Sequence, residues 1–295
     1  MFGLLNVYKP SGITSFDVIR HLRRQIGRKV KIGHAGTLDP MAEGVLLVLL
    51  GPATRLADVL HAYEKEYVVT GELGATSSTD DAEGEIQPTP GAAPPAAEAV
   101  AATVRQFVGR IRQVPPSHSA VKVGGRRAYE LARQGKQPDL TGREVVVHEL
   151  EILHYDWPEL KLRVVCGTGT YIRAIVRDLG RRLEVGAYCK ELIRTRIGPF
   201  PAEAAARMED LEAGPLEPLL ISPIEAMPAE ARLPVSDAQG RRLALGQVVE
   251  YTALPESARD QKVLGAVDPA GRLVALVRPE AAGKLRPVKV LAGGD

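Results

Sequence analysis

Cysteine, aromatic residues and net charge are all scarce in this chain of 295 residues. Its two cysteines, Cys166 and Cys189, lie far apart, and its six histidines show no His-Glu-x-x-His spacing. A disulfide framework and a zinc site are therefore not expected. The longest apolar run, Val45 to Leu50, is far shorter than the ~20 residues that span a bilayer. The chain also lacks a basic segment followed by a long apolar one near Met1, so we expect no signal peptide and a soluble, cytoplasmic protein.

Positive charge is concentrated near the N-terminus although the whole chain is almost neutral. The 38 basic and 36 acidic side chains leave a formal charge of only +2, so attraction to a polyanion requires local clustering. A basic cluster precedes Gly33, and its members are Arg20, Arg23, Arg24, Arg28, Lys29 and Lys31. Either a solvated helix face or a phosphate-contacting surface explains this cluster.

Hydrophobic periodicity predicts a larger domain in which strands and helices mix without strict alternation. This mixture favours an α+β fold with a mainly antiparallel sheet over a parallel, doubly wound one. Strands are predicted over residues 4–7, 45–50, 66–73, 145–154, 160–166 and 192–197, and a strand-like segment after Pro116. Helices are predicted over 14–27, 53–63, 95–108, 128–133 and 171–183. The first of them has Thr14 as its N-cap and an apolar stripe that includes Phe16.

Two composition changes indicate how the chain is divided. Residues 74–84 are polar, and residues 88–95 are rich in proline, glycine and alanine, so residues 74–100 are predicted to form an exposed insertion. A boundary is predicted near residues 225–234. Beyond it, short strands flank the turn at Asp268–Gly271, which is typical of a small, hairpin-rich β-domain over 231–295.

The segment Gly33-His34-Ala35-Gly36-Thr37-Leu38-Asp39-Pro40 presents a carboxylate on a constrained backbone. Pro40 fixes its own φ and pushes Asp39 toward extended dihedral angles, while Gly33 and Gly36 allow tight turns. We expect a short loop here that is neither helix nor strand. An Asp of this kind is usually a turn residue, but the loop also suits an active site with one carboxylate.

Three further polar residues lie beside predicted strands or turns. Lys9 precedes Pro10, Tyr67 lies within a strand, and Arg173 lies just inside a helix that follows the flexible segment 167–170. Each alone fits an ordinary structural role. No Ser-His-Asp order, phosphate-binding loop, dinucleotide fingerprint or paired-carboxylate motif is present.

Taken in order along the chain, these segments resemble the motifs of the bacterial TruB-type tRNA pseudouridine synthases. The matching motifs are Lys9-Pro10-x-Gly12-x-Thr14-Ser15, Gly33 to Pro40, Lys65-Glu66-Tyr67, Pro115-Pro116-x-x-Ser119-Ala120-x-Lys122, Ala128-Tyr129-x-x-Ala132-Arg133 and Gly169-Thr170-Tyr171-Ile172-Arg173. The resemblance covers about residues 4–200, and the segment after about residue 232 resembles a PUA-type RNA-binding domain. The chain departs from the family at Ala35, at Ser77-Ser78 and at Ile193, where the family often has arginine.

The resemblance implies a catalytic domain over residues 1–230, with helices and loops around a central cleft, and a PUA-like domain over 231–295. It implies an isomerase that converts uridine 55 of the tRNA T-loop to pseudouridine. No atoms enter or leave the base, so neither a metal nor another cofactor is required. Asp39 would attack the ribose C1′, add to C6 of the base, or remove a 2′ proton, and the sequence does not choose among these three roles.

The remaining residue roles also come from the resemblance. Arg173 would pair with Asp39; Tyr67 would stack on the flipped base and serve proton transfer at C5; Leu192 would pack on the other side. His34 would fill the gap that the flipped nucleotide leaves in the RNA. Lys9 would have a structural role near the site. Phosphate contacts would come from Arg23, Arg24, Arg126, Arg127 and Arg133, and the 74–100 insertion would clasp the tRNA arm.

The resemblance implies a monomer that acts on tRNA without an obligate protein partner. The first alternative is a guide-RNA-dependent synthase subunit of the archaeal and eukaryotic type, which would need added guide RNA. The second is a non-catalytic RNA-binding or RNA-folding protein, against which the joint presence of Asp39, Tyr67 and Arg173 argues. The third is a metal-free hydrolase, which would release free uracil.

Overall fold

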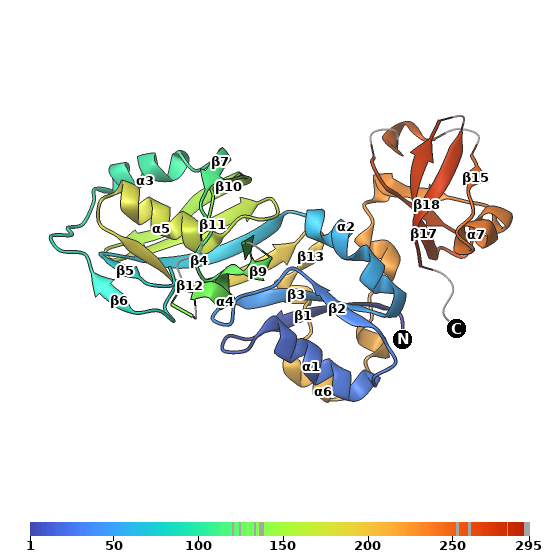
Figure 1. Cartoon of the computed structure of the whole chain (residues 1–295), viewed down its shortest axis with the longest axis horizontal. Coiled ribbons are helices and arrows are strands. Elements are labelled where there is room, and N and C mark those ends of the chain that lie inside the picture. The colour runs from blue at the N-terminus through green and yellow to red at the C-terminus, as the bar shows by residue number, and fades with distance from the viewer. Residues whose placement is uncertain are drawn as a thin grey trace.

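A computed structural model describes residues 1–119, 121–123, 125–132, 134–135, 139–251, 254–258, 261–281 and 283–291. Figure 1 shows a broad sheet with helices on it and, at the right, a smaller sheet near the C-terminus. The described residues contain no helix whose length and apolar character would let it cross a bilayer.

The larger sheet has nine strands in the described residues, in the order β1-β3-β12-β4-β11-β10-β7, with β2 paired to β3 and β13 paired to β12. Its strands are β1 (Gly3–Lys9), β2 (Ile32–Ala35), β3 (Glu43–Leu50), β4 (Lys65–Leu73), β7 (Gly109–Gln113), β10 (Arg143–Asp156), β11 (Glu159–Cys166), β12 (Ala187–Ile197) and β13 (Phe200–Pro201). Among the described pairs of this sheet only β12 and β3 run parallel. The prediction of a mixed, mainly antiparallel α+β fold is confirmed.

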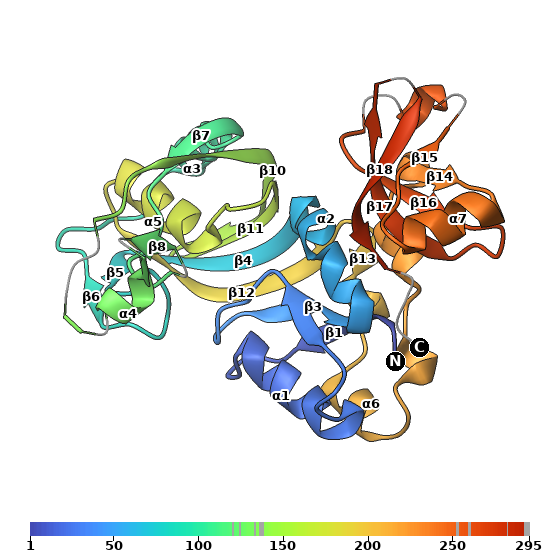
Figure 2. The same ribbon diagram turned by 45° about the vertical axis from the view of Figure 1, so that its right-hand side comes forward.

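Helices cover both halves of this sheet (Figures 1 and 2). They are α1 (Ser15–Ile26), η1 (Gly51–Leu56), α2 (Ala57–Ala62), α3 (Ala97–Arg105), α4 (Ala128–Ala132), α5 (Ile172–Arg182) and α6 (Met208–Glu212). The N-cap of α1 is Thr14, which forms a capping box with Asp17 as predicted. Apolar residues of α1 and α6, among them Val18, Leu22 and Leu211, pack on Leu5 of β1 and Val48 of β3.

The smaller sheet has the order β14-β16-β17-β18-β15, and the helix α7 (Asp237–Ala244) packs on it. Its strands are β14 (Arg232–Pro234), β15 (Val249–Glu250), β16 (Leu264–Val267), β17 (Leu273–Glu280) and β18 (Lys284–Val290). The hairpin predicted around residues 268–271 is present between β16 and β17. Short elements complete the chain: β5 (Ala75–Ser77), β6 (Ile86–Pro88), β8 (Lys122–Val123), β9 (Arg126–Arg127), η2 (Ala202–Ala204), η3 (Glu217–Leu219), η4 (Pro223–Ala226), η5 (Ala229–Ala231) and η6 (Glu256–Ala258).

The prediction that residues 33–40 contain no strand is wrong in its first part. Gly33, His34 and Ala35 belong to β2, which pairs antiparallel with β3 over residues 47–50. One edge of β3 pairs with β1, and β12 pairs with residues 43 and 44 on β3 in the parallel direction. β2 adds hydrogen bonds along the C-terminal half of β3, and buried backbone groups need such partners. The loop that carries Asp39 is therefore confined to residues 36–42.

Three predictions about helix faces and strand limits are also wrong. Phe16 is 63% exposed, because α1 buries Ser15, Val18, Ile19 and Leu22 instead. The strand-like segment predicted after Pro116 is much shorter than expected, because among the described residues it consists of the two-residue strands β8 and β9. The longer β7 ends before Pro115 and Pro116, which have no N–H to continue a ladder. The helix predicted over 95–108 is the shorter α3, and Pro95 lies before it rather than in its first turn.

Candidate active site

Four of the predicted site residues line a single pocket of about 240 Å³. Asp39 comes from the loop before β3, Tyr67 from β4, Arg173 from the first turn of α5 and Leu192 from β12. The sheet brings them together because β12 lies between β3 and β4 in its order. Tyr67 is opposite Arg194 on the neighbouring strand, two residues beyond Leu192.

The loop that carries Asp39 is held from behind by buried side chains. The Ser15 hydroxyl accepts a hydrogen bond from the Leu38 N–H at 2.9 Å and donates to the Leu38 carbonyl at 3.1 Å. The Arg194 guanidinium is 2% exposed and donates to the carbonyl of Gly36 at 3.0 Å and to that of Val45 at 2.7 Å. These bonds fix the backbone on both sides of Asp39, so the carboxylate points into the pocket from a rigid support.

Lys9 lies behind the same loop, where it is fully buried. Its Nζ donates to the carbonyls of Pro10 at 2.9 Å, Ile13 at 2.7 Å and Pro40 at 3.2 Å. Burial lowers the pKa of Lys9 to about 8, against the opposing attraction of the Asp39 charge. Lys9 is not among the residues that line the pocket. Its contacts are those of a side chain that joins the β1–α1 turn to the Asp39 loop.

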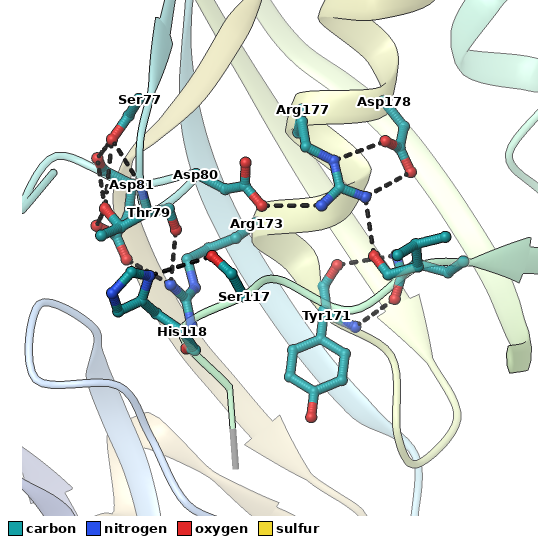
Figure 3. A network of polar contacts seen from close by, with 12 residues as sticks. Ser77, Thr79, Asp80, Asp81, Ser117, His118, Tyr171, Arg173, Arg177 and Asp178 are labelled. Carbon is teal, nitrogen blue, oxygen red and sulfur yellow. Dashed lines mark hydrogen bonds and ion pairs between the residues drawn. The ribbon is translucent and has the colours of Figure 1, made fainter. Parts of the chain in front are cut away.

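Arg173 connects Asp39 to the segment that follows β5. Figure 3 shows its contacts with Asp81, Thr79 and His118. Its Nε lies 2.9 Å from a carboxylate oxygen of Asp39, and its Nη1 lies 2.6 Å from one of Asp81. The same guanidinium donates to the Thr79 carbonyl and to the His118 carbonyl, each at 2.9 Å. Because every nitrogen of this guanidinium has an acceptor, Arg173 is locked in one orientation.

A second arginine of α5 strengthens this arrangement, as Figure 3 shows. Arg177, one turn after Arg173, binds Asp80 at 2.8 Å and donates to the carbonyl of Val114 at 2.8 Å. Asp80 has a positive φ of 63°, a conformation that Asp tolerates better than most residues. Two consecutive carboxylates, Asp80 and Asp81, therefore meet two arginines on one face of α5.

The surroundings of the pocket raise the pKa of Asp39 and of Tyr67. Burial raises the pKa of Asp39, the nearby Asp81 charge raises it further, and Arg173 opposes both effects. Burial also raises the pKa of the Tyr67 hydroxyl, and the neighbouring Arg194 charge opposes this rise. The Asp39 side chain keeps 36% of its surface exposed, so it remains open to a bound molecule.

His34 lies in β2, outside the residues that line the pocket. Burial lowers its pKa, and the charges of Arg194 and His61 lower it further. Its Nδ1 is buried and has no hydrogen-bond partner among the described residues.

The predicted phosphate-binding arginines whose side chains the structure describes are not among the residues that line the pocket. Arg23 donates to the carbonyls of Gly27 at 3.0 Å and of Val30, so its guanidinium holds the loop after α1. Arg24 is exposed on α1 and Arg126 is exposed on β9. Arg133 and the side chain of Arg127 fall outside the described residues.

Sequence reasoning misses Asp81 and Arg194. Residues 74–84 are predicted to be exposed, yet Asp81 is only 3% exposed because it is paired with Arg173. Two adjacent aspartates in the sequence do not by themselves indicate a buried site. Their arginine partners on α5 are far away in the sequence and come close only in the folded protein. Arg194 gives no signal of its own, because alternation along a strand does not distinguish a buried arginine from an exposed one.

The lining of the pocket combines the aromatic ring of Tyr67, the apolar side chain of Leu192 and the carboxylate of Asp39. The described residues contain no group of three His, Cys, Asp or Glu side chains that could hold a metal ion. Such a site fits chemistry at a base or its sugar by a single carboxylate.

Comparisons with known proteins agree with this interpretation. Family models match the TruB family pseudouridylate synthase N-terminal domain over residues 23–172, the tRNA pseudouridylate synthase B C-terminal domain over 173–225 and the tRNA pseudouridine synthase II C-terminal domain over 231–292. The tRNA pseudouridine synthase B of Thermobifida fusca is 42% identical over 99% of each chain. That of Dehalococcoides mccartyi is 40% identical over 98% of this chain and 96% of its own.

Among solved structures, one chain of the archaeal box H/ACA sRNP Nop10–Cbf5 complex superposes with a TM-score of 0.70. It is 26% identical, and the match covers 100% of this chain and 87% of that one. The fold is that of a pseudouridine synthase. The chain belongs to the TruB family of these enzymes.

Proposed function

We propose that this protein isomerises uridine 55 in the T-loop of tRNA to pseudouridine. The observation that carries the proposal is the Asp39 carboxylate, 2.9 Å from Arg173 in a pocket shared with Tyr67 and Leu192. The relatives named tRNA pseudouridine synthase B match nearly the whole chain, which supports a tRNA substrate.

In this proposal the target uridine leaves the RNA stack and its base enters the pocket. Tyr67 stacks on one face of the base and Leu192 packs against the other. Asp39 assists cleavage of the C–N glycosidic bond, by attack on C1′, addition to C6 or removal of the 2′ proton. The base turns and rejoins through C5. The Tyr67 hydroxyl relays the proton lost from C5 by accepting it and giving up its own, and N1, released from the ribose, gains one proton, so the base loses and gains one proton. The product is an isomer of the substrate, so atoms and electrons balance without a cofactor.

Arg173 acts on Asp39 by charge and by position. Its guanidinium counters the burial that raises the pKa of Asp39 and so keeps a larger fraction ionised. His34 fills the place of the flipped nucleotide in the RNA, which its position on β2 beside the Asp39 loop supports. Lys9 has a structural role, which its three carbonyl contacts support.

We also propose the wider organisation that the resemblance implies. Residues 1–230 form the catalytic domain, residues 231–295 the PUA-like domain, and the insertion over 74–100 clasps the tRNA arm. Phosphates of the RNA contact Arg23, Arg24, Arg126, Arg127 and Arg133. The protein works in the cytoplasm as a monomer without an obligate protein partner.

The decisive variant is Asp39→Asn, which keeps the size of the side chain and removes its charge. We expect it to abolish pseudouridine formation in a T-arm hairpin while RNA affinity stays within about twofold, since most contacts remain. Carbodiimide labelling detects the product, and Asp237→Asn on α7 is the control. Product formation by Asp39→Asn at the normal rate would remove Asp39 from catalysis.

The same assay separates the alternatives. Activity of the purified protein on a bare hairpin supports the stand-alone enzyme, whereas a requirement for added guide RNA supports the guide-dependent type. Release of free uracil would identify a hydrolase. RNA binding without any product would identify a non-catalytic RNA-binding protein.

A further inference from the structure

A second pocket, which we call the basic pocket, lies outside the active site and has a volume of about 350 Å³. Its lining comes from the loop before β2, from η1 and from the N-terminus: Met1, Lys29, Val30, Lys31, Gly51, Pro52, Thr54 and Arg55. Three of these side chains are cationic and none is a carboxylate. A pocket of this composition attracts anions.

The three cations of the basic pocket are not neutralised by the protein. Lys29, Lys31 and Arg55 are exposed, and none of them forms an ion pair with another described residue. Arg55 donates to the backbone carbonyl of Val290, which leaves its charge uncompensated. Asp58, further along the same helical segment, is already paired with Lys289 at 2.5 Å.

The backbone that supports the basic pocket is well fixed. The Gly51 N–H donates to the Lys31 carbonyl at 2.7 Å, and the Thr54 hydroxyl donates to the Gly51 carbonyl at 2.9 Å. Gly51 has a φ of 61°, and a Cβ there would lie 2.8 Å from the Met1 carbonyl oxygen. Arg23 holds the other side of the loop through the Val30 carbonyl. The cations are thus presented from a preformed cavity and not from a free surface loop.

The same two elements connect the basic pocket to the active site. The helical segment η1–α2 carries Arg55 in the last turn of η1 and His61 in the last turn of α2, and His61 lines the active-site pocket. About six residues separate them, or roughly 10 Å along a helix. β2 likewise runs from Lys31 toward Gly36, which also lines the active-site pocket. The segment η1–α2 and β2 lie in contact with each other, and Figure 1 shows α2 beside β2.

We propose that the basic pocket binds backbone phosphate of the RNA whose target nucleotide occupies the active site. This inference rests on the proposed function, which supplies the RNA substrate, and it adds a second site at which that RNA is bound. Phosphate is the part of RNA that a set of unpaired cations recognises, and its recognition does not depend on sequence. Lys29 and Lys31 are the main contacts, because their side chains have no hydrogen bond or ion pair with the described residues. Arg55 extends the pocket toward the smaller sheet.

The test is the salt dependence of RNA binding by Lys31→Gln and by Lys29→Gln/Lys31→Gln. Removal of one phosphate-binding cation lowers the slope of log K against log salt by about 0.7 to 0.9. We expect one such step for Lys31→Gln and a second for the double variant. Lys161→Gln on β11 removes the same charge elsewhere and is the matched control. Slopes and affinities equal to wild type in both variants would overturn the proposal.

Three further measurements test whether the bound group is a phosphate of the RNA and lies in the basic pocket. The binding measurements are made in an Asp39→Asn background, so they do not depend on catalysis. In a series of hairpins, a single phosphate of the stem or loop is replaced by an uncharged methylphosphonate. One of these replacements should weaken binding to the wild-type protein, and the same replacement should not weaken binding to Lys31→Gln. Inorganic phosphate is the probe for a small-anion site: if it protects wild type but not Lys31→Gln from thermal unfolding, while RNA affinity is equal, RNA is not the ligand.

Failure of this inference and failure of the proposed function give different results. If no pseudouridine forms but Lys31→Gln weakens RNA binding, the basic pocket is an RNA contact on a protein with another function. If pseudouridine forms normally and the salt slope does not change, the enzyme assignment stands and the basic pocket has no part in RNA binding.

Discussion

At the scale of single residues, one positive charge serves two carboxylates. Arg173 is 4% exposed and lies within ion-pair distance of both Asp39 and Asp81. If Arg173 had a single carboxylate partner, the two charges would cancel. With both Asp39 and Asp81 beside it, the three side chains together carry a net negative charge when both carboxylates are ionised. The residual charge opposes ionisation of Asp39 and helps to raise its pKa. Asp81 thus orients Arg173 at a cost to the ionisation of Asp39.

Replacement of Asp81 separates these two effects. We expect Asp81→Asn to lower kcat roughly ten- to hundredfold, because Arg173 loses the partner that fixes its orientation. Asp39 acts as a carboxylate, so activity falls when the pH drops through its raised pKa. Loss of the Asp81 charge lowers that pKa, and the acidic limb of the pH–rate profile should move to lower pH.

The pH profile of kcat/KM measures this movement in wild type and variant. Asp178→Asn is the control, because Asp178 pairs with Arg177 and Arg181 and not with Arg173. An acidic limb at the wild-type position in Asp81→Asn would contradict the electrostatic part of the argument.

Lys9 gives a second prediction at this scale. Its pKa of about 8 in the folded protein lies below the ordinary value of 10.5, so the unfolded chain binds more protons between these values. Stability contributed through Lys9 therefore rises with pH from about 8 to 10.5, by a few kcal/mol at most. Lys9→Met should lack this rise, while Lys65 titrates in both proteins. Urea unfolding across this pH range measures the free energy of unfolding of both proteins. If that free energy changes with pH in the same way in wild type and in Lys9→Met, the prediction is wrong.

At the scale of elements, the sequence predicts the helices and strands whose formation depends on their own residues. The α1 cap at Thr14, the buried β3 and the amphipathic α5 all follow from local patterns. β2 does not, because it forms only where β3 offers free hydrogen-bonding groups. The position of Asp39, Tyr67 and Arg173 could be inferred only through the family resemblance. Their common pocket, and the role of Asp80 and Asp81 in it, depends on packing between segments far apart in the chain.

The packing of α5 on β12 leads to a prediction about this element. A Cβ at Gly180 would lie 2.3 Å from the backbone nitrogen of Ala187 and 2.4 Å from its Cβ. Gly180→Ala should therefore cost about 1–3 kcal/mol of stability, although alanine favours helix more than glycine. Gly214→Ala is the matched control, since nothing lies within 4 Å of a Cβ there. Thermal unfolding compares them, and equal midpoints for the two variants would show that α5 can move away from β12.

At the scale of the whole molecule, the two sheets share one apolar core. A single cluster of buried residues includes Leu47 and Leu60 from the larger unit and Leu233 and Leu276 from the smaller one. Polar contacts reinforce the junction, between Asp58 and Lys289 and between Arg55 and the Val290 carbonyl. A continuous core of this kind favours cooperative unfolding over independent melting of two domains.

A core substitution in the smaller sheet should therefore destabilise the larger one as well. Leu276 on β17 is 3% exposed, and Leu276→Ala should cost about 2–5 kcal/mol. Trp157, the single tryptophan of the chain, lies between β10 and β11 and reports only on the larger unit. We expect its fluorescence to give the same lowered urea midpoint as circular dichroism, because the shared core transmits the loss. A Trp157 midpoint that stays at the wild-type value, with an earlier transition by circular dichroism, would mean that the two units unfold separately.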